Sequence, residues 1–277
     1  MRAATAAARI GTVTNSERLA RTEEALPGGR THGAVRVGDT VRRRTQPWTP
    51  SVHALLRHLD AVGFTGAPRV LGFDDQGREM LSHLDGDTVA GRVPLPGWAL
   101  ADGTVRQVGD WLRGLHDATR SFVPPDGAVW FAGPPWRPGL VIGHQDAGPH
   151  NAVWRDDRLV GFIDFDTAGP TAPEFDLAFA ALAWAPLHAR RAIERLGFSA
   201  ASADRGRRLG LLLDGYGYTG DRVALRPVVA RRAQVQADVI RAGAAAGDPV
   251  SADLLDLADD LAVAAAEVSE LPDSFWR

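Results

Sequence analysis

The stretch VIGHQDAGPHNAVWRDDRLVGFIDFDTAGP, residues 141–170, decides the fold of this 277-residue chain. It begins with an apolar strand, continues through a short polar stretch and ends in a hairpin. The side chains in it that carry acid–base or metal-binding chemistry are His144, Asp146, Asn151, Asp164 and Asp166. Carboxylate, amide and imidazole groups clustered directly after an apolar strand indicate a functional site at the end of that strand.

The hairpin sets the expected geometry of this site. Its strands are expected at 152–155 and 160–163, joined by a turn at 156–159. In the symmetric register, Asn151 lies opposite Asp164 at the open end, with Cβ atoms about 4.5–5.5 Å apart. An amide oxygen and a carboxylate placed in this way can bind one Mg²⁺ ion, which prefers oxygen ligands.

Asp146 precedes Asn151 across a short loop, so its carboxylate can orient a nucleophile or accept its proton beside that metal. The order H-x-D-x-x-x-x-N followed by D-F-x is the pattern of kinase catalytic and metal-binding loops. A polar loop with a hairpin cap is the alternative, and the order and spacing favour the chemical interpretation. For Asp166 two interpretations stay open: metal or water binding, or a cap on the following turn.

Composition excludes several kinds of protein. All 31 basic residues are arginine, so any phosphate anchor must be an arginine, and the absence of cysteine excludes disulfides and thiolate sites. A net charge of -3 argues against a nucleic-acid partner. No apolar run is long enough to span a bilayer, and the first residues lack a signal-peptide core. A cytoplasmic protein with no membrane partner is therefore expected.

The rest of the chain is expected to form two regions. Residues 1–22 are expected to be a poorly structured leader, and residues 23–88 a small antiparallel sheet with one helix. Thr49 is expected to be the N-cap of that helix, with Pro50 at its first position. Residues 89–277 are expected to be mainly helical.

These motifs together resemble the aminoglycoside phosphotransferase family, also called the phosphotransferase enzyme family. The matching elements keep the family's order: LPGG (26–29), VRVGDTVRR (35–43), VLGFDDQGREMLSHLDG (70–86), WLRGLH (111–116), the loop of His144, Asp146 and Asn151, IDFDTAGP (163–170) and EFDLA (174–178). The resemblance implies an α+β, protein-kinase-like fold of two lobes. ATP or GTP would lie between an N-lobe at 23–88 and a C-lobe at 89–277.

The resemblance also implies roles for individual residues. Asp146 and His144 match the catalytic positions, Asp146 orienting the acceptor hydroxyl and His144 bracing the loop. Asn151 and Asp164 match the Mg²⁺ ligands, with Asp166 beside them. The nucleotide would be contacted by a glycine loop around Gly29, by an arginine on the second strand, and by a hinge whose backbone meets the purine, at Ser82, His83 and Leu84.

Several positions depart from the family pattern. An arginine replaces the usual phosphate-anchoring lysine, and counting back from the end of the strand favours Arg42 over Arg43. The helix that begins near Pro50 offers no glutamate to pair with this cation, and only His53 is nearby. Asp176 is expected to cap a helix rather than to support the active site.

The sequence therefore predicts an Mg²⁺-dependent kinase that phosphorylates a hydroxyl of a small molecule, an antibiotic or a metabolite, with antibiotic resistance as its biological context. The missing lysine and glutamate motivate an alternative: a non-catalytic nucleotide-binding or immunity-type protein of the same fold. A kinase of protein hydroxyls is less favoured, because the central region is short and no activation-segment signature is present.

Overall fold

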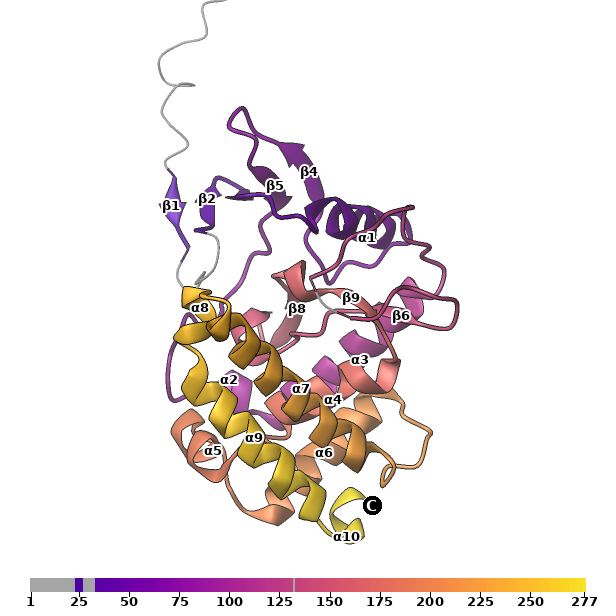
Figure 1. The fold of residues 1–277 in the computed structure, drawn as a ribbon, viewed down its shortest axis with the longest axis vertical. Helices are drawn as coiled ribbons and strands as arrows, with labels where there is room; N and C mark the ends of the chain where they lie inside the picture. Colours follow the sequence, from indigo (N-terminus) through magenta and orange to yellow (C-terminus); the bar gives the residue numbers. More distant parts are fainter. Residues whose placement is uncertain (1–22, 27–32, 132) are drawn as a thin grey trace, which may run out of the picture.

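The N-terminal part of the chain is an antiparallel sheet beside one helix (Figure 1). The computed structural model describes residues 23–26, 33–131 and 133–277. The sheet has the order β1-β2-β3-β5-β4. Its strands are β1 (Glu24–Ala25), β2 (Val35–Val37), β3 (Thr40–Arg43), β4 (Val70–Phe73) and β5 (Glu79–Ser82). Strands β2 and β3 form a hairpin, and its turn includes Gly38 at a φ of 61°, a left-handed conformation that glycine adopts without strain.

Helix α1 (Thr49–Ala61) follows β3 and turns its apolar side toward the interior. Its fully buried apolar residues recur at helical spacing: Val52, Leu55, Leu56 and Leu59. The predicted N-cap is wrong, because Trp48 occupies that position and Thr49 is the first helical residue. The Thr49 hydroxyl instead accepts the backbone N–H of Gln46 at 2.8 Å, which fixes the turn that leads into the helix.

The C-terminal part is built mainly from helices (Figure 1). They are α2 (Gly97–Leu100), α3 (Asp102–Thr119), α4 (Pro173–Trp184), α5 (Arg190–Leu196), α6 (Ser202–Tyr216), α7 (Leu225–Ala245), α8 (Pro249–Ala252), α9 (Leu255–Glu270) and α10 (Asp273–Trp276). Helix α3 packs along α6, and α7 packs against both α9 and α4. An antiparallel-sheet region followed by a helical region confirms the predicted α+β fold of two lobes.

Two short strand pairs carry the segment at 141–170. Strand β6 (Val141–Gly143) pairs antiparallel with β9 (Gly169–Thr171), and β7 (Ala152–Arg155) pairs with β8 (Arg158–Phe162). Single turns of 3-10 helix lie beside them, η1 (Pro149–Asn151) before β7 and η2 (Phe165–Thr167) after β8. Asn151 therefore directly precedes β7, Asp164 follows β8 by two residues, and Asp166 lies in η2.

The predicted register of the second hairpin is wrong. Asp156 and Asp157 form its turn alone, with φ values of 51° and 59°, and a register shift follows between Val153 and Trp154. Two left-handed residues give the tight turn whose twist matches that of paired strands. As a result Ala152 faces Phe162, and the N–H of Ile163, not of Asp164, donates to Asn151 O at 2.9 Å.

The connection between the two parts of the chain is tied to this hairpin. Asp87 and Trp154 exchange both backbone hydrogen bonds, at 2.7 and 2.8 Å. Trp98 stacks on Trp154 with ring centroids 5.4 Å apart. A Cβ atom at Gly86 would lie 2.7 Å from Trp154 O, so only glycine permits this approach. The expected division between residues 88 and 89 falls beside this link and stays a prediction.

Among the described residues, no helix combines the length and the apolar character needed to cross a membrane.

Candidate active site

The catalytic loop that follows β6 is held by a buried carboxylate from α4. Asp176 is 1% exposed and accepts the backbone N–H groups of His144 at 3.1 Å and of Gln145 at 2.6 Å. His116 donates to the same carboxylate through Nε2 at 2.9 Å, and the Tyr216 hydroxyl lies 2.8 Å from His116 Nδ1. We call this group, Asp176 with His116, Tyr216 and the two loop N–H groups, the loop anchor.

The loop anchor corrects the expected role of Asp176. The N-cap of α4 is Ala172, so Asp176 lies inside the first turn and turns its carboxylate toward β6. A Cβ atom at Gly143 would lie 2.6 Å from Asp176 Oδ2, so the approach requires glycine there. Burial raises the pKa of Asp176, but hydrogen bonds from His116 and the loop, with the nearby imidazoles, hold the pKa below its usual range.

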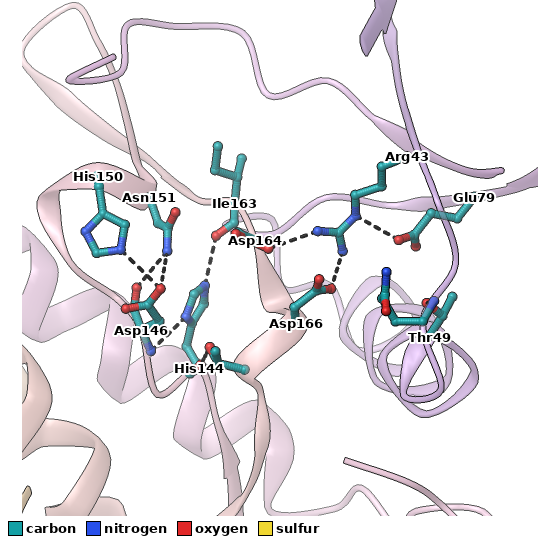
Figure 2. Close-up of polar contacts among 12 residues, drawn as sticks. Arg43, Thr49, Glu79, His144, Asp146, His150, Asn151, Ile163, Asp164 and Asp166 are labelled. Atoms are coloured by element: carbon teal, nitrogen blue, oxygen red, sulfur yellow. Dashed lines mark hydrogen bonds and ion pairs between the residues drawn. The ribbon is translucent and has the colours of Figure 1, made fainter. Parts of the chain in front are cut away.

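His144 is fully buried and joins the loop to the strand that precedes Asp164. Its Nε2 donates to Ile163 O at 3.0 Å, and its Nδ1 accepts the N–H of Asp146 at 3.3 Å (Figure 2). Burial lowers the pKa of His144, and the carboxylates of Asp146 and Asp176 oppose that shift only in part. Both nitrogens of this imidazole are engaged, so His144 links the loop to the backbone before Asp164.

Asp146 is at the end of this loop with its side chain one quarter exposed. Its Oδ2 accepts Asn151 Nδ2 at 2.9 Å and lies 3.1 Å from His150 Nε2 (Figure 2). Burial raises the pKa of Asp146, but His150, His144 and Arg232 outweigh burial and lower it. The carboxylate is therefore ionised near neutral pH and can accept a hydrogen bond from a substrate hydroxyl.

Asn151 is bonded across the hairpin to the residue before Asp164, because the Ile163 N–H donates to Asn151 O at 2.9 Å, in a register other than the predicted one. The Asn151 amide nitrogen donates to both the backbone and the carboxylate of Asp146, which directs its oxygen away from Asp146. Asp164 adopts a left-handed backbone conformation, with φ 63° and ψ 67°, and its side chain is 47% exposed. A non-glycine residue in this region is strained, which is common where a side chain is aimed at a ligand.

An arginine from the N-terminal sheet pairs with Asp164 and Asp166, and it is Arg43 rather than the expected Arg42. Arg43 Nη1 lies 2.9 Å from Asp164, Nη2 lies 2.6 Å from Asp166, and Nε donates to Glu79 at 2.7 Å (Figure 2). We call these four residues the Arg43 cluster. Neighbouring strand residues point to opposite faces, and Arg42 instead pairs with Asp74 at 3.6 Å on the other face. The nucleotide-binding role was expected of Arg42. The geometry favours Arg43 for it, and the role itself stays a prediction.

The expected hinge residues lie at and beyond the end of β5. The N–H of Ser82 donates to Arg69 O at 2.8 Å, and that of His83 donates to Asp39 O at 2.9 Å. The N–H groups of Ser82 and His83 are therefore already bonded within the protein, and contact of this segment with a purine stays a prediction. Gly29, expected in the phosphate cradle, lies outside the described residues.

The oxygen donors of the site fit a divalent cation. The Asn151 amide oxygen and the carboxylates of Asp164 and Asp166 are the hard ligands that Mg²⁺ takes. The Arg43 cluster holds three carboxylates against one guanidinium, so it carries surplus negative charge. No group of three or more acidic, histidine or cysteine ligands forms a closed cage in the described part of the chain. An Mg²⁺ ion would therefore complete its shell with water and phosphate oxygens.

Two functional contacts were not found from the sequence. Glu79 faces Arg43 directly across the β3–β5 pair, and the signal for it was an acidic residue at an inward position of an otherwise apolar strand. Arg232 on α7 is 7% exposed and donates through Nη2 to Gln145 O at 2.7 Å, over the rings of Phe175 and Phe179. It had no local signal, because it lies far along the chain from the loop it contacts.

The fold and the site together define a two-lobe protein with kinase-like architecture, and comparison with known proteins agrees. A model of the phosphotransferase enzyme family matches residues 128–211, which include the catalytic loop and the second hairpin. The trifolitoxin immunity protein of Rhizobium leguminosarum bv. trifolii is 42% identical over 200 residues, which cover 70% of this chain and 74% of that protein. The chain belongs to the phosphotransferase enzyme family.

Solved structures with low sequence identity share the fold. The GDP complex of aminoglycoside 2'-phosphotransferase-IIIa superposes with a TM-score of 0.57 at 16% identity, covering 89% of this chain and 93% of that one. A choline/ethanolamine kinase family protein from Mesorhizobium loti gives a TM-score of 0.53 at 18% identity, covering 91% and 89%. The resemblance inferred from the sequence motifs is confirmed at the level of family and fold.

Proposed function

We propose that this protein transfers the terminal phosphoryl group of ATP or GTP to a hydroxyl group of a small molecule, with Mg²⁺ as the metal. The observation that carries the proposal is the Asp146 carboxylate, ionised, partly exposed and bonded to Asn151, close to the Arg43 cluster. Family membership and a structural neighbour determined as a GDP complex support a nucleotide co-substrate.

In the proposed transfer, Asp146 acts on the acceptor hydroxyl and the residues around it hold it in position. Asp146 accepts the proton of the acceptor hydroxyl as the acceptor oxygen forms its bond to the γ-phosphorus. The bond from that phosphorus to the β–γ bridging oxygen breaks, and the nucleoside diphosphate leaves with the electron pair. His144 and the loop anchor keep Asp146 in place. Most of the rate enhancement in phosphoryl transfer comes from such positioning and from charge stabilisation.

The phosphates of the nucleotide are proposed to bind at the Arg43 cluster, on the side of the site that faces the N-terminal sheet. Asn151 and Asp164, with Asp166 beside them, would hold Mg²⁺, which neutralises phosphate charge when it is bound. The Nη groups of Arg43 would face the phosphates from the sheet, and Leu84 would meet the purine. Gly29 remains the proposed phosphate cradle in the glycine loop.

The acceptor is proposed to be an antibiotic, toxin or metabolite hydroxyl. Relatives of this fold are named for aminoglycosides and for choline or ethanolamine, so the fold leaves the acceptor open. The 42% identical relative is named an immunity protein, and phosphorylation of a toxin hydroxyl is one chemical route to immunity. Among the acidic residues of α9, Asp260 is buried and pairs with Arg191, and Arg195 Nη2 lies 3.8 Å from it.

A second candidate function is a non-catalytic, immunity-type protein that binds a nucleotide without transferring its phosphate. The observation that favours it is that Arg43 bonds to both Asp164 and Asp166, the carboxylates that Mg²⁺ would need. The name of the 42% identical relative is compatible with either candidate.

One pair of experiments separates the two candidates. Thermal unfolding with ATP or GTP, with and without Mg²⁺, should show an Mg²⁺-dependent rise in Tm by mass action. Asp164→Ala should remove that rise, and the exposed Asp126→Ala serves as the control. Transfer of labelled γ-phosphate to a panel of alcohols should then fall about 10²–10⁴-fold in Asp146→Asn, with nucleotide binding retained. Binding without transfer in the wild type would favour the second candidate, and no binding of either nucleotide would refute both.

A further inference from the structure

The buried carboxylate of Glu79 connects Arg43 to helix α1. Glu79 is 1% exposed and uses both oxygens: Oε1 accepts Arg43 Nε at 2.7 Å, and Oε2 lies 2.7 Å from His53 Nε2. His53 is 2% exposed and belongs to α1. A buried carboxylate is costly unless each oxygen has a hydrogen-bonding partner, and here the partners come from a neighbouring strand and from the helix.

The orientation of the guanidinium follows from this contact. The group is planar, with its donors in a fixed fork, so binding Nε to Glu79 sets the direction in which Nη1 and Nη2 point. In the structure they point at Asp164 and Asp166 (Figure 2). Without Glu79 the long side chain would regain its rotamer freedom, which disfavours any single position of the Nη groups.

The acid that pairs with the cation of β3 comes from the sheet and not from helix α1. The helix offers no glutamate for the strand cation, and the acid is supplied by β5, directly opposite Arg43 in the register of β3 and β5. The helix supplies an imidazole that braces the acid. Lysine could not take this place, because a single ammonium cannot present one donor to Glu79 and two coplanar donors to carboxylates on the other side.

Resting on the proposed function, we propose that Glu79 and His53 are positioning residues for phosphate capture. His53 holds Glu79, Glu79 holds Arg43 Nε, and the two Nη groups are thereby kept beside Asp164 and Asp166, where the nucleotide phosphates would bind with Mg²⁺. We call this chain of contacts the His53–Glu79–Arg43 relay. It makes phosphate binding depend on the position of α1, which carries His53.

The test compares ligands that reach Arg43 with ligands that do not. Calorimetric titrations with MgATP and MgGTP, and in parallel with adenosine and guanosine, are made on each variant. Glu79→Gln keeps the shape and removes the charge, and it should weaken triphosphate binding about 10-fold while leaving nucleoside binding unchanged. A purely structural role of Glu79 would weaken both kinds of ligand together. Thermal unfolding in the absence of ligand checks that each variant is folded.

Matched variants isolate each step of the relay. His53→Leu removes the brace and should weaken triphosphate binding about 3-fold, whereas His53→Gln places an amide nitrogen near Nε2 and should restore it. His58→Leu is the control on the same helix, because His58 bonds to Ala118 O instead. For the cation, Arg43→Met should weaken triphosphate binding at least as much as Glu79→Gln, and Arg42→Met should not.

A double-mutant cycle decides between the relay and independent effects. If Glu79 acts through Arg43, Glu79→Gln should add nothing to Arg43→Met. Additive losses in the cycle, or equal losses for nucleosides and triphosphates, would overturn the relay while leaving the proposed function intact. Failure of the wild type to bind any of the four ligands would instead refute the proposed function, and the relay with it.

Discussion

The two sides of the site are held by different physical means. The loop anchor lies in the helical part, where one buried carboxylate is satisfied by two backbone N–H groups and an imidazole. The Arg43 cluster joins the N-terminal sheet to the catalytic segment, and its Asp164 side chain is 47% exposed. The comparison teaches that the loop of Asp146 is held by a fully buried carboxylate, whereas the Arg43 cluster joins a buried arginine and Glu79 to Asp164, which is half exposed.

The largest effect is expected from Asp176→Asn in the loop anchor. The new amide would turn an N–H donor toward a backbone N–H that now donates to Asp176, and one buried donor would lose its acceptor. Removing the charge of one partner in a buried, charge-assisted set of hydrogen bonds lowers the free energy of unfolding by about 3–5 kcal/mol. Urea unfolding followed by circular dichroism measures it, with the exposed Asp238→Asn as the control. A loss below about 1 kcal/mol, the range of a surface contact, would show that the anchor is not rigid.

Local sequence patterns predicted the elements of the site well, because they depend on near neighbours. The apolar strand, the polar loop and the D-F-D segment follow one another within 141–170. The spacing alone predicted that Asp146, Asn151 and Asp164 belong to one loop and the hairpin after it. The family and the α+β fold followed from the order of those motifs.

What the sequence could not predict depends on register and on distant contacts. One residue of error along β3 moved the expected cation from the inward Arg43 to the outward Arg42. The hairpin register failed because a two-residue turn and a bulge cannot be told from a longer turn by composition. Asp176 was assigned to its own helix, since nothing local shows that its carboxylate bonds to a loop 31 residues earlier.

A smaller effect is expected from pH, and it acts mainly through a buried histidine that belongs to neither side of the site. Burial lowers the pKa of His188 from 6.5 to about 4, with Asp260 opposing the shift and Arg195 adding to it. The unfolded chain therefore binds more protons than the folded one as pH falls below 6.5, so the stabilisation is complete above that pH and is lost toward pH 4.

Lowering the pH from about 7 to about 5.5 should therefore cost roughly 1 kcal/mol through His188, and His144, whose pKa is also lowered by burial, acts in the same direction. Urea unfolding across this range should show a shallower pH dependence in His188→Gln. Val123→Ala should leave the slope unchanged, because this exposed substitution removes no titrating group. A steeper slope in either variant would contradict the assignment.

The smallest effect on stability is expected from Asp164→Asn, the same chemical change as in the loop anchor made on the other side of the site. Asp164 is half exposed, its ion pair with Arg43 is open to solvent, and Arg43 keeps Glu79 and Asp166. Exposed pairs contribute about 0–1 kcal/mol, and removing one of three carboxylates also relieves their mutual repulsion. The unfolding free energy should thus change by less than about 0.5 kcal/mol, although the Mg²⁺-dependent rise in Tm with nucleotide disappears. A destabilisation as large as that of Asp176→Asn would mean that the Arg43 cluster holds the two lobes together as firmly as the anchor holds the loop.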